Sequence, residues 1–258
     1  MTHFTIVTIN WNNLAGLQKT YESVASQTYR NFRWIVVDGA SNDGAAEWLQ
    51  TVNEPWAQIT SEKDNGLYDA MNKGLERAVT TPGYTLFLNS GDWLYDKRVL
   101  ETVARTIEQA QVQPKYVYGD FARYSAAGRV HHFPGKPIER LFVGMPSSHQ
   151  AMYFENELLK TVRFRDASYK LSADYCMLIE FVNQIESREQ IVHIRQPLCV
   201  FDNTGVSVQR RFEALKEDVH IRRKHLNLSA FRNYGLYALH YVHAHIRNLQ
   251  AAREDRTA

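Results

Sequence analysis

Short apolar runs alternate with amphipathic stretches along the first half of the chain. β-branched and aromatic residues fill segments 4–9, 32–37, 57–60, 84–88 and 116–120, a composition typical of buried strands. Between them, apolar side chains recur at helical spacing in segments 14–24, 44–48, 68–79 and 97–110. This alternation predicts βαβ units, and therefore an α/β protein with a mostly parallel central sheet flanked by helices.

The second half of the chain has a less regular pattern. Gly135, Pro137, Gly144 and Pro146 interrupt a loop-rich stretch, after which segment 150–154 is expected to form a strand. A helix is expected over 172–185, and two short strands over 192–194 and 198–201, on either side of Pro197. From residue 208 onward the pattern is helical. We therefore expect one domain over 1–207, with a regular half (1–120) and a less regular half (121–207), followed by a helical extension over 208–258.

The composition is that of an ordinary globular protein. Hydrophobic residues make up 44% of the chain and aromatic residues 12%, which excludes a disordered chain. No apolar run reaches the ~18 residues of a membrane span, and the N-terminus lacks the pattern of a signal peptide. Cys176 and Cys199 lie in apolar stretches and are expected to be buried free thiols. Together these features favour a cytoplasmic protein.

The C-terminal extension is basic, although the whole chain is almost neutral. Segment 208–258 holds ten Lys and Arg against five Asp and Glu, and five of the ten His residues. In its last helix one stripe combines aromatic and aliphatic residues: Phe231, Tyr234, Ala238, Tyr241, Val242, His245 and Leu249. Such a helix fits the boundary of a membrane, and packing of the stripe onto the domain is the simpler alternative. Nucleic acid is not an expected partner.

Polar side chains gather where the predicted strands end. Asn10 and Trp11 follow the first strand, Asp38 the second, Asp64 the third and Asp92 the fourth. In an open parallel sheet, ligands bind outside the carboxyl ends of the strands, so we expect these residues to surround one crevice. The glycine-rich fingerprints of dinucleotide-binding proteins, P-loop proteins and α/β hydrolases are absent from the sequence.

Carboxylates in this crevice indicate a particular chemistry. They would repel a bare diphosphate, but one carboxylate that binds Mg²⁺ or Mn²⁺ together with phosphate oxygens would attract it. Such an ion neutralises the charge of a departing diphosphate, and another carboxylate serves as a base toward an acceptor hydroxyl group. The pattern therefore favours group transfer from a nucleoside-diphosphate compound.

Four ordered motifs make the assignment more specific. They are Ile6–Asn13 (IVTINWNN), Ser26–Gly44 (SQTYRNFRWIVVDGASNDG), Ser61–Gly74 (SEKDNGLYDAMNKG) and Phe87–Asp92 (FLNSGD). In this order the chain resembles the family-2 glycosyltransferases of GT-A fold over roughly residues 4–210. It is most similar to the bacterial subgroup that builds colanic-acid-type exopolysaccharide or O-antigen units.

The resemblance implies a role for each matching residue. Asn10 and Trp11 would line the base pocket, Asp38 would accept the N3–H of a uracil, and Asp64 would approach the base or ribose beside Gly66. Asp92 would coordinate Mn²⁺ or Mg²⁺ with the diphosphate. Asp174, in the motif Ser172-Ala173-Asp174-Tyr175, matches the catalytic base. A cap at the start of a helix is the alternative role for Asp174.

Other residues are weaker candidates for the donor and acceptor pocket. They are Ser90, Gly91, Asp120, His149 and Arg210, the last as part of a lid with segment 205–207. Structural roles are the alternative for His149 and Arg210. We expect Asn42 and Asp43 to form only a turn, and Tyr68, Met71 and Leu75 to belong to the core of a helix.

The chain departs from the family pattern in its metal motif, Asn89-Ser90-Gly91-Asp92, where Asp92 is the only acid. The resulting hypothesis is a metal-dependent, inverting hexosyltransferase. Its donor would be a UDP-sugar, and its acceptor a glycan on a polyprenyl diphosphate at the inner face of the cell membrane. A non-catalytic module that binds a nucleotide sugar or glycan is the alternative, supported by the altered metal motif. A nucleotidyltransferase would need a basic glycine-rich loop after the first strand, which the sequence lacks.

Overall fold

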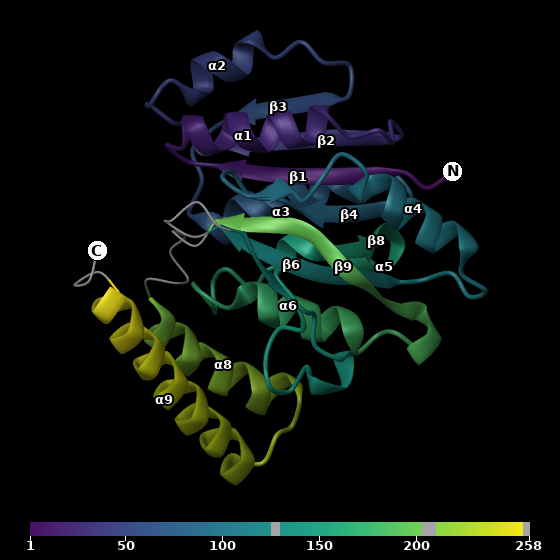
Figure 1. The fold of residues 1–258 in the computed structure, drawn as a ribbon. Helices are drawn as coiled ribbons and strands as arrows, with labels where there is room; N and C mark the ends of the chain where they lie inside the picture. Colours follow the sequence, from purple (N-terminus) through teal and green to yellow (C-terminus); the bar gives the residue numbers. More distant parts are fainter. Residues whose placement is uncertain (125–129, 203–209, 255–258) are drawn as a thin grey trace.

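The computed structural model describes residues 1–124, 130–202 and 210–254. A mixed sheet lies at its centre, with strand order β3-β2-β1-β4-β8-β6-β9-β5 (Figure 1). The strands are β1 (Phe4–Asn10), β2 (Phe32–Asp38), β3 (Ala57–Ser61), β4 (Tyr84–Phe87), β5 (Trp93–Leu94), β6 (Tyr116–Tyr124), β7 (Val130–Phe133), β8 (Met152–Glu155) and β9 (Ile191–Asp202). The first four strands are parallel, as predicted, whereas β8 runs antiparallel to both of its neighbours.

Helices cover both faces of the sheet. They are α1 (Leu14–Ala25), α2 (Ala45–Thr51), α3 (Leu67–Ala78), α4 (Val99–Gln109), α5 (Asn156–Leu159), α6 (Ala173–Val182), α8 (Arg211–His225) and α9 (Ala230–Glu254). Alternate residues of a strand point to opposite faces, so β1 sends Val7 to the core under α3 and α6, and Ile6 to the core under α1, α2 and α4. The α/β prediction is confirmed.

Two strand predictions of the second half need correction. Segments 192–194 and 198–201 belong to one strand, β9, which passes through Pro197. Proline has no backbone N–H to donate to a ladder, and the register between β6 and β9 shifts at Asp120, the residue opposite Pro197. The strand expected from residue 150 begins at Met152, because His149–Ala151 form a short 3₁₀ helix, η2.

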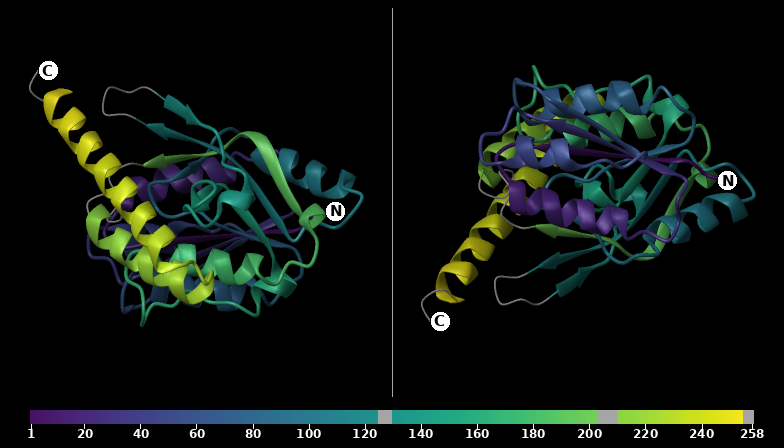
Figure 2. Two further views of the ribbon diagram at one scale, coloured as in Figure 1. Left: turned by 90° about the horizontal axis from the view of Figure 1, so that it is seen from below. Right: turned by 90° about the horizontal axis from the view of Figure 1, so that it is seen from above.

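The C-terminal extension consists of α8 and α9, which lie side by side below the sheet (Figure 1). The far end of α9 projects away from the rest of the molecule in both views of Figure 2. No helix in the described part of the chain combines the length and the hydropathy needed to cross a membrane.

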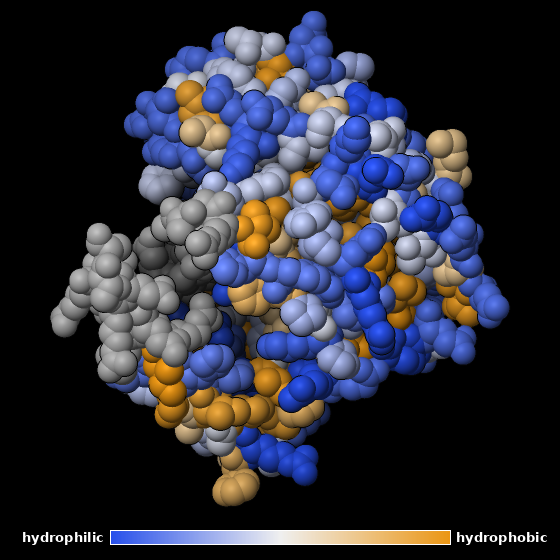
Figure 3. Space-filling view, in the orientation of Figure 1, coloured by the Kyte–Doolittle hydropathy of each residue, from blue (hydrophilic) through white to orange (hydrophobic). Residues whose placement is uncertain are grey.

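The stripe expected from the sequence packs on α8 only in part. Asn233, which lies outside the stripe, is fully buried and donates a hydrogen bond from Nδ2 to the carbonyl oxygen of Val219, at 2.7 Å. Two residues of the stripe, Tyr241 and His245, contact the ring of Phe212 on α8, with ring centroids 5.0 and 6.4 Å away. Phe231 of the stripe is 91% exposed. Among the described side chains of α9, the exposed large apolar residues are Phe231, Tyr234, Leu239, Tyr241, Val242 and Ile246, and Figure 3 shows apolar surface along this edge of the molecule.

Candidate active site

The carboxyl ends of β1 and β2 form one wall of the crevice. Asp38 is fully buried, and its two oxygens accept hydrogen bonds from the Asn10 amide, the Ser41 hydroxyl and N–H groups, and the Ser61 hydroxyl. Burial raises the pKa of Asp38, but these hydrogen bonds outweigh burial and hold the pKa below its ordinary value. In this arrangement Asp38 organises the pocket wall, and its contact with a base stays a prediction.

The residues expected to meet the nucleotide do lie together. Trp11 is 72% exposed at the end of β1, beside Gly39 at the end of β2. A Cβ atom on Gly39 would lie 2.5 Å from Oδ2 of Asp64 and 3.2 Å from Cδ1 of Trp11. Any side chain at Gly39 would therefore push these residues apart, a constraint that sequence reasoning missed. Gly66 begins α3 with a φ of +111°, a conformation that favours glycine.

Asp43 has the structural role expected of it, and a larger one than a turn. Its Oδ2 accepts the N–H of Leu14 at 2.8 Å, and its Oδ1 accepts the N–H of Ala45 at 3.1 Å. These are the first residues of α1 and α2. One carboxylate therefore caps two helices.

Asp92 lies in the loop after β4 and is 4% exposed. Its Oδ1 accepts the backbone N–H of Asp202 at 2.8 Å, and its Oδ2 accepts the side-chain amide of Gln150. Burial raises the pKa of Asp92, the neighbouring Asp202 carboxylate adds to this effect, and these hydrogen bonds oppose it, with the result that the pKa lies at about 7. The end of β9 thus brings a second acid to Asp92, 110 residues further along the chain.

These two carboxylates fit a divalent cation of the Mg²⁺ or Mn²⁺ class, which prefers oxygen ligands. No Lys or Arg forms an ion pair with Asp92 in the residues that the structure describes. A buried carboxylate next to another carboxylate is unfavourable without a compensating positive charge. Asp202 was missed because its motif, Cys199-Val200-Phe201-Asp202, gives no signal before the sheet is assembled.

The loop between β4 and Asp92 is tightly held. The N–H of Gly91 donates to the hydroxyl oxygen of Thr20 at 3.1 Å, and that hydroxyl donates to the carbonyl oxygen of Asp92 at 2.7 Å. Gly91 has a φ of +98°, and Ser90 donates from its hydroxyl to the carbonyl oxygen of Asn13 at 3.3 Å. Ser90 and Gly91 therefore shape the loop that presents Asp92.

Asp174 lies in the first turn of α6, with its side chain 21% exposed. The hydroxyl of Tyr68, on α3, donates to Oδ1 of Asp174 at 3.1 Å. Nδ1 of His149 lies 3.6 Å from Oδ2 of Asp174. The alternative role expected for Asp174, a cap at the start of a helix, has partial support: Oδ1 of Asp174 accepts the N–H of Tyr175 in the first turn of α6, at 2.9 Å. The side chain of Ser172, the residue before α6, makes no capping hydrogen bond.

Tyr68 and His149 connect Asp174 with the rest of the crevice. Tyr68 is buried, as expected of a core residue, yet its hydroxyl group reaches the predicted base. Burial and the negative charge of Asp174 raise the pKa of Tyr68 well above its ordinary value, so Tyr68 remains a donor. Burial lowers the pKa of His149 while Asp174 opposes this effect, and Nε2 of His149 lies 3.2 Å from Nδ2 of Asn89.

The short helix η2 places the two acids in one site. His149 faces Asp174, and the next residue, Gln150, donates to Asp92. Two neighbouring residues of η2 thus contact the two carboxylates, His149 that of Asp174 and Gln150 that of Asp92. This arrangement suits a reaction that needs a cation at one acid and a proton acceptor at the other.

Two weaker candidates make other contacts. Asp120 is 4% exposed, and its oxygens lie 2.9 Å from Nε2 of His193 and 3.1 Å from Nε2 of His132. It also accepts the N–H of Gly135 at 2.8 Å, so two histidines and one backbone N–H hold this carboxylate, and its contact with a sugar or acceptor stays a prediction. Arg210 pairs with Glu213 on the surface, as in the alternative role expected for it. Segment 205–207 lies outside the described residues.

Comparison with known proteins gives one consistent family. The family model described as Glycosyl transferase family 2 matches residues 5–159. An uncharacterized glycosyltransferase of Mycobacterium tuberculosis is 30% identical over 218 residues, which cover 83% of this chain and 80% of that protein. A PGL/p-HBAD biosynthesis glycosyltransferase of Mycobacterium bovis is 30% identical over 176 residues, or 67% of this chain and 66% of the relative.

Solved structures share the fold at low sequence identity. TarS 1–349 of S. aureus in complex with UDP-GlcNAc matches with a TM-score of 0.66 and 14% identity, over 95% of this chain and 73% of that one. A mannosyltransferase of Pyrobaculum calidifontis in complex with GDP-Man and Mn²⁺ matches with a TM-score of 0.62 and 15% identity, over 88% and 65%. The GT-A fold expected from the sequence is confirmed.

Proposed function

The chain belongs to glycosyl transferase family 2, and on this premise we propose that it transfers a sugar from a UDP-sugar to a hydroxyl group of a bacterial surface glycan, with inversion at the anomeric carbon. The observation that carries the proposal is the pairing of Asp174 with Tyr68 and His149, beside the acid pair of Asp92 and Asp202.

In the proposed reaction, Asp174 accepts the proton of the acceptor hydroxyl group as its oxygen forms a bond to the anomeric carbon. The bond from that carbon to the diphosphate breaks on the opposite face. The Tyr68 hydroxyl orients one oxygen of Asp174, so that the other oxygen faces the crevice. His149, whose pKa burial lowers, stays neutral near pH 7 and leaves the charge of Asp174 uncompensated.

Asp92 and Asp202 would hold a divalent cation, Mn²⁺ or Mg²⁺, which when bound stabilises the charge of the departing diphosphate. Trp11 offers its exposed ring to the base, beside Gly39 and Asp64. UDP is supported by the structural neighbour solved with UDP-GlcNAc, and a role in building a glycan is supported by the mycobacterial relative, a PGL/p-HBAD biosynthesis glycosyltransferase. The non-catalytic alternative depended on a single acid in the metal motif, and Asp202 weakens that argument.

The acceptor is proposed to be carried by a lipid at the membrane surface. The exposed apolar side chains of α9 lie along one side of the helix, and the basic residue Arg232 directly follows Phe231 in the sequence. A helix with an exposed apolar face binds the boundary between lipid headgroups and acyl chains. In this arrangement α9 would hold the crevice near a polyprenyl-linked glycan.

The test is a comparison of wild type with Asp174→Asn in two assays. Binding is measured as a rise in melting temperature with UDP, GDP, dTDP or CMP, each with Mn²⁺ and with EDTA. We expect UDP with Mn²⁺ to give the largest rise in both proteins. Transfer or donor hydrolysis should fall by at least ~10² in Asp174→Asn, because a general base contributes about that much or more. Equal rates in both proteins would overturn the role of Asp174.

A further inference from the structure

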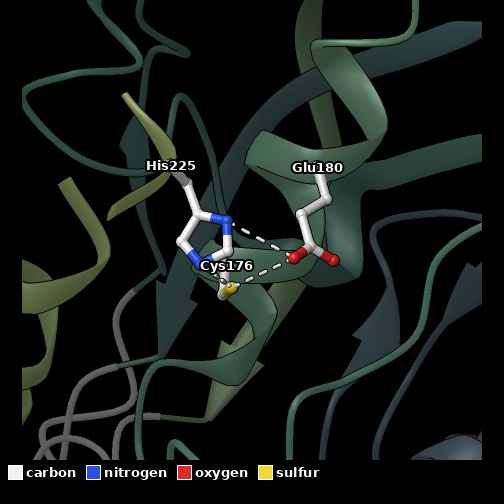
Figure 4. Close-up of side chains that lie close together, drawn as sticks. All are labelled: Cys176, Glu180 and His225. Carbon is white, nitrogen blue, oxygen red and sulfur yellow. Dashed lines mark hydrogen bonds and ion pairs between the residues drawn. The ribbon is translucent and has the colours of Figure 1, made fainter. Parts of the chain in front are cut away.

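A second cluster of metal-ligating side chains lies away from the crevice, where α6 meets the end of α8. Cys176 and Glu180 lie one turn apart on α6, and His225 is the last residue of α8 (Figure 4). Sγ of Cys176 lies 3.5 Å from Nε2 of His225 and 4.0 Å from Oε1 of Glu180. Nδ1 of His225 lies 3.4 Å from the same Glu180 oxygen. One ligand atom from each residue lies within 4.8 Å of the others.

The cluster is buried on one side and reachable on the other. Cys176 is fully buried, whereas the side chains of Glu180 and His225 are each 15% exposed. Arg165 donates from Nε to both oxygens of Glu180, at 3.1 and 3.2 Å, and holds this carboxylate in place. The Glu180 carboxylate is therefore fixed before any ion binds.

The same three residue types could form a nucleophilic triad, but the burial of Cys176 argues against it. Its thiol has no exposed surface for a substrate, and burial raises its pKa to about 12. A reactive cysteine needs an accessible thiolate. A metal ion is much smaller than a substrate, so it needs only a narrow path to reach the Cys176 thiol.

We propose that Cys176, Glu180 and His225 form a binding site for a borderline-soft divalent cation, with Zn²⁺ as the ion that suits this ligand set. Thiolate, imidazole and carboxylate groups together are typical ligands of Zn²⁺. Sulfur and nitrogen ligands at roughly 2.3 and 2.0 Å from a tetrahedral ion lie about 3.5 Å apart. This is the separation of Cys176 and His225, and water on the exposed side completes the coordination.

The site would clamp α8 onto the helix that carries Asp174. Glu217, also on α8, accepts the N–H groups of Lys170, Leu171 and Ser172, each at 2.9 Å. These three residues lead directly into α6 and Asp174. A metal ion between Cys176 and His225 would add a second link between the same two helices. The ion is therefore a structural clamp, distinct from the cation proposed at Asp92.

The experiment uses the full chain, first stripped of metal with a chelator. Cd²⁺ is the probe, because its bond to a thiolate gives an ultraviolet charge-transfer band that Mn²⁺ and Mg²⁺ do not give. We expect one Cd²⁺ per chain with this band. Zn²⁺ at 100 times its Kd should raise the melting temperature by roughly 5–10 °C. The same measurements are repeated in the Asp92→Asn variant, in which the other proposed cation site is weakened. The Cd²⁺ band and the rise in melting temperature with Zn²⁺ should both persist in this variant.

Matched variants decide the outcome. Cys199→Ser changes the other buried cysteine and should keep the band and the shift. Cys176→Ser should lose the band, and His225→Gln should weaken Zn²⁺ at least ~10-fold while the thiol remains. Absence of a thiolate band in wild type, or an unchanged Zn²⁺ affinity in His225→Gln, would overturn the site. These measurements need no sugar donor. A failure of the metal site and a failure of the proposed transferase activity can therefore be distinguished.

Discussion

The hydroxyl group of Tyr68 donates a hydrogen bond to Oδ1 of Asp174 across 3.1 Å, and it joins two helices that are 106 residues apart in the sequence. A buried aromatic residue of α3 thereby orients the proposed base on α6. The ring of Tyr68 also stacks on Phe164, with the centroids 5.7 Å apart. The packing role and the positioning role can be separated, because only the second needs the hydroxyl group.

Tyr68→Phe tests this separation. The variant keeps the ring and removes the donor, so we expect kcat to fall about tenfold or more, since a hydrogen bond to a charged group contributes about 1.5–3 kcal/mol. UDP affinity should stay within twofold. Tyr116→Phe is the control, because its buried hydroxyl group has no hydrogen-bond partner in the part of the chain that the structure describes, and this variant should keep the wild-type kcat. A normal kcat in Tyr68→Phe would remove Tyr68 from the mechanism.

The acid pair makes a prediction about metal dependence. Asp92→Asn should raise the Mn²⁺ concentration needed for half-maximal UDP binding at least ~10-fold, because it removes a charged ligand. Asp202→Asn should raise the same concentration by a smaller factor, since its backbone N–H still supports Asp92. Calorimetric titration of UDP at several Mn²⁺ concentrations measures both. If Asp202→Asn titrates as wild type does, Asp202 is not part of the metal site.

His240 makes a prediction about acid stability. Burial, together with the positive charges of Arg222, Arg211 and Lys136, lowers its pKa from 6.5 to about 4. The unfolded chain therefore binds a proton near pH 6.5 that the folded chain does not bind until about pH 4, and the free energy of unfolding falls as the pH falls through this window. Above pH 6.5 the contribution is fully present.

The measurement is the difference in melting temperature between pH 7.5 and pH 5. We expect this difference to be smaller in His240→Asn than in wild type, because the variant has no group to protonate. His243→Asn is the matched control, since His243 is exposed on the same helix, and it should keep the wild-type difference. An equal pH dependence in His240→Asn and wild type would contradict the prediction.

The exposed face of α9 makes a prediction about membranes. The full chain should sediment with vesicles that contain anionic lipid, and the triple variant Phe231→Ser, Leu239→Ser and Val242→Ser should stay in solution, because each buried apolar side chain contributes about 1.5–3 kcal/mol. Tyr95→Ser with Val112→Ser is the control, since these exposed apolar residues lie outside α9. Equal sedimentation of the triple variant and wild type would exclude α9 as the anchor.

The sequence alone predicts much of the fold and part of the site. The period of apolar residues predicts the strands of the parallel half, because a buried strand between amphipathic helices leaves a local signature. The carboxyl ends of parallel strands must meet at one edge, so the approach of Asn10, Trp11, Asp38 and Asp64 is predictable as well. The resemblance to the family also predicts Asp174 as the base, a role that stays a prediction.

What only the tertiary structure decided involves contacts between distant segments. Asp202 meets Asp92, and Tyr68 meets Asp174, only after β9 and α3 take their places in the sheet and its helical layers. The interior position of Asp38 depends on four hydrogen bonds, which come from the last residues of β1 and β3 and from Ser41 in the loop after β2. Local propensity carries no information about which side chains will share such a site.

The outward face of α9 is also decided by contacts between segments and not by local sequence. Periodicity identifies an apolar stripe on this helix, but it does not say which face meets α8. Asn233 takes the packed position because its amide satisfies the backbone carbonyl group of Val219, while Phe231 stays exposed. The sequence therefore determined the family and the parallel half of the sheet, and it predicted the proposed base. Packing decided the second acid, the contacts of Asp174 and the exposed face of α9, because each depends on the energy of contacts that exist only in the assembled fold.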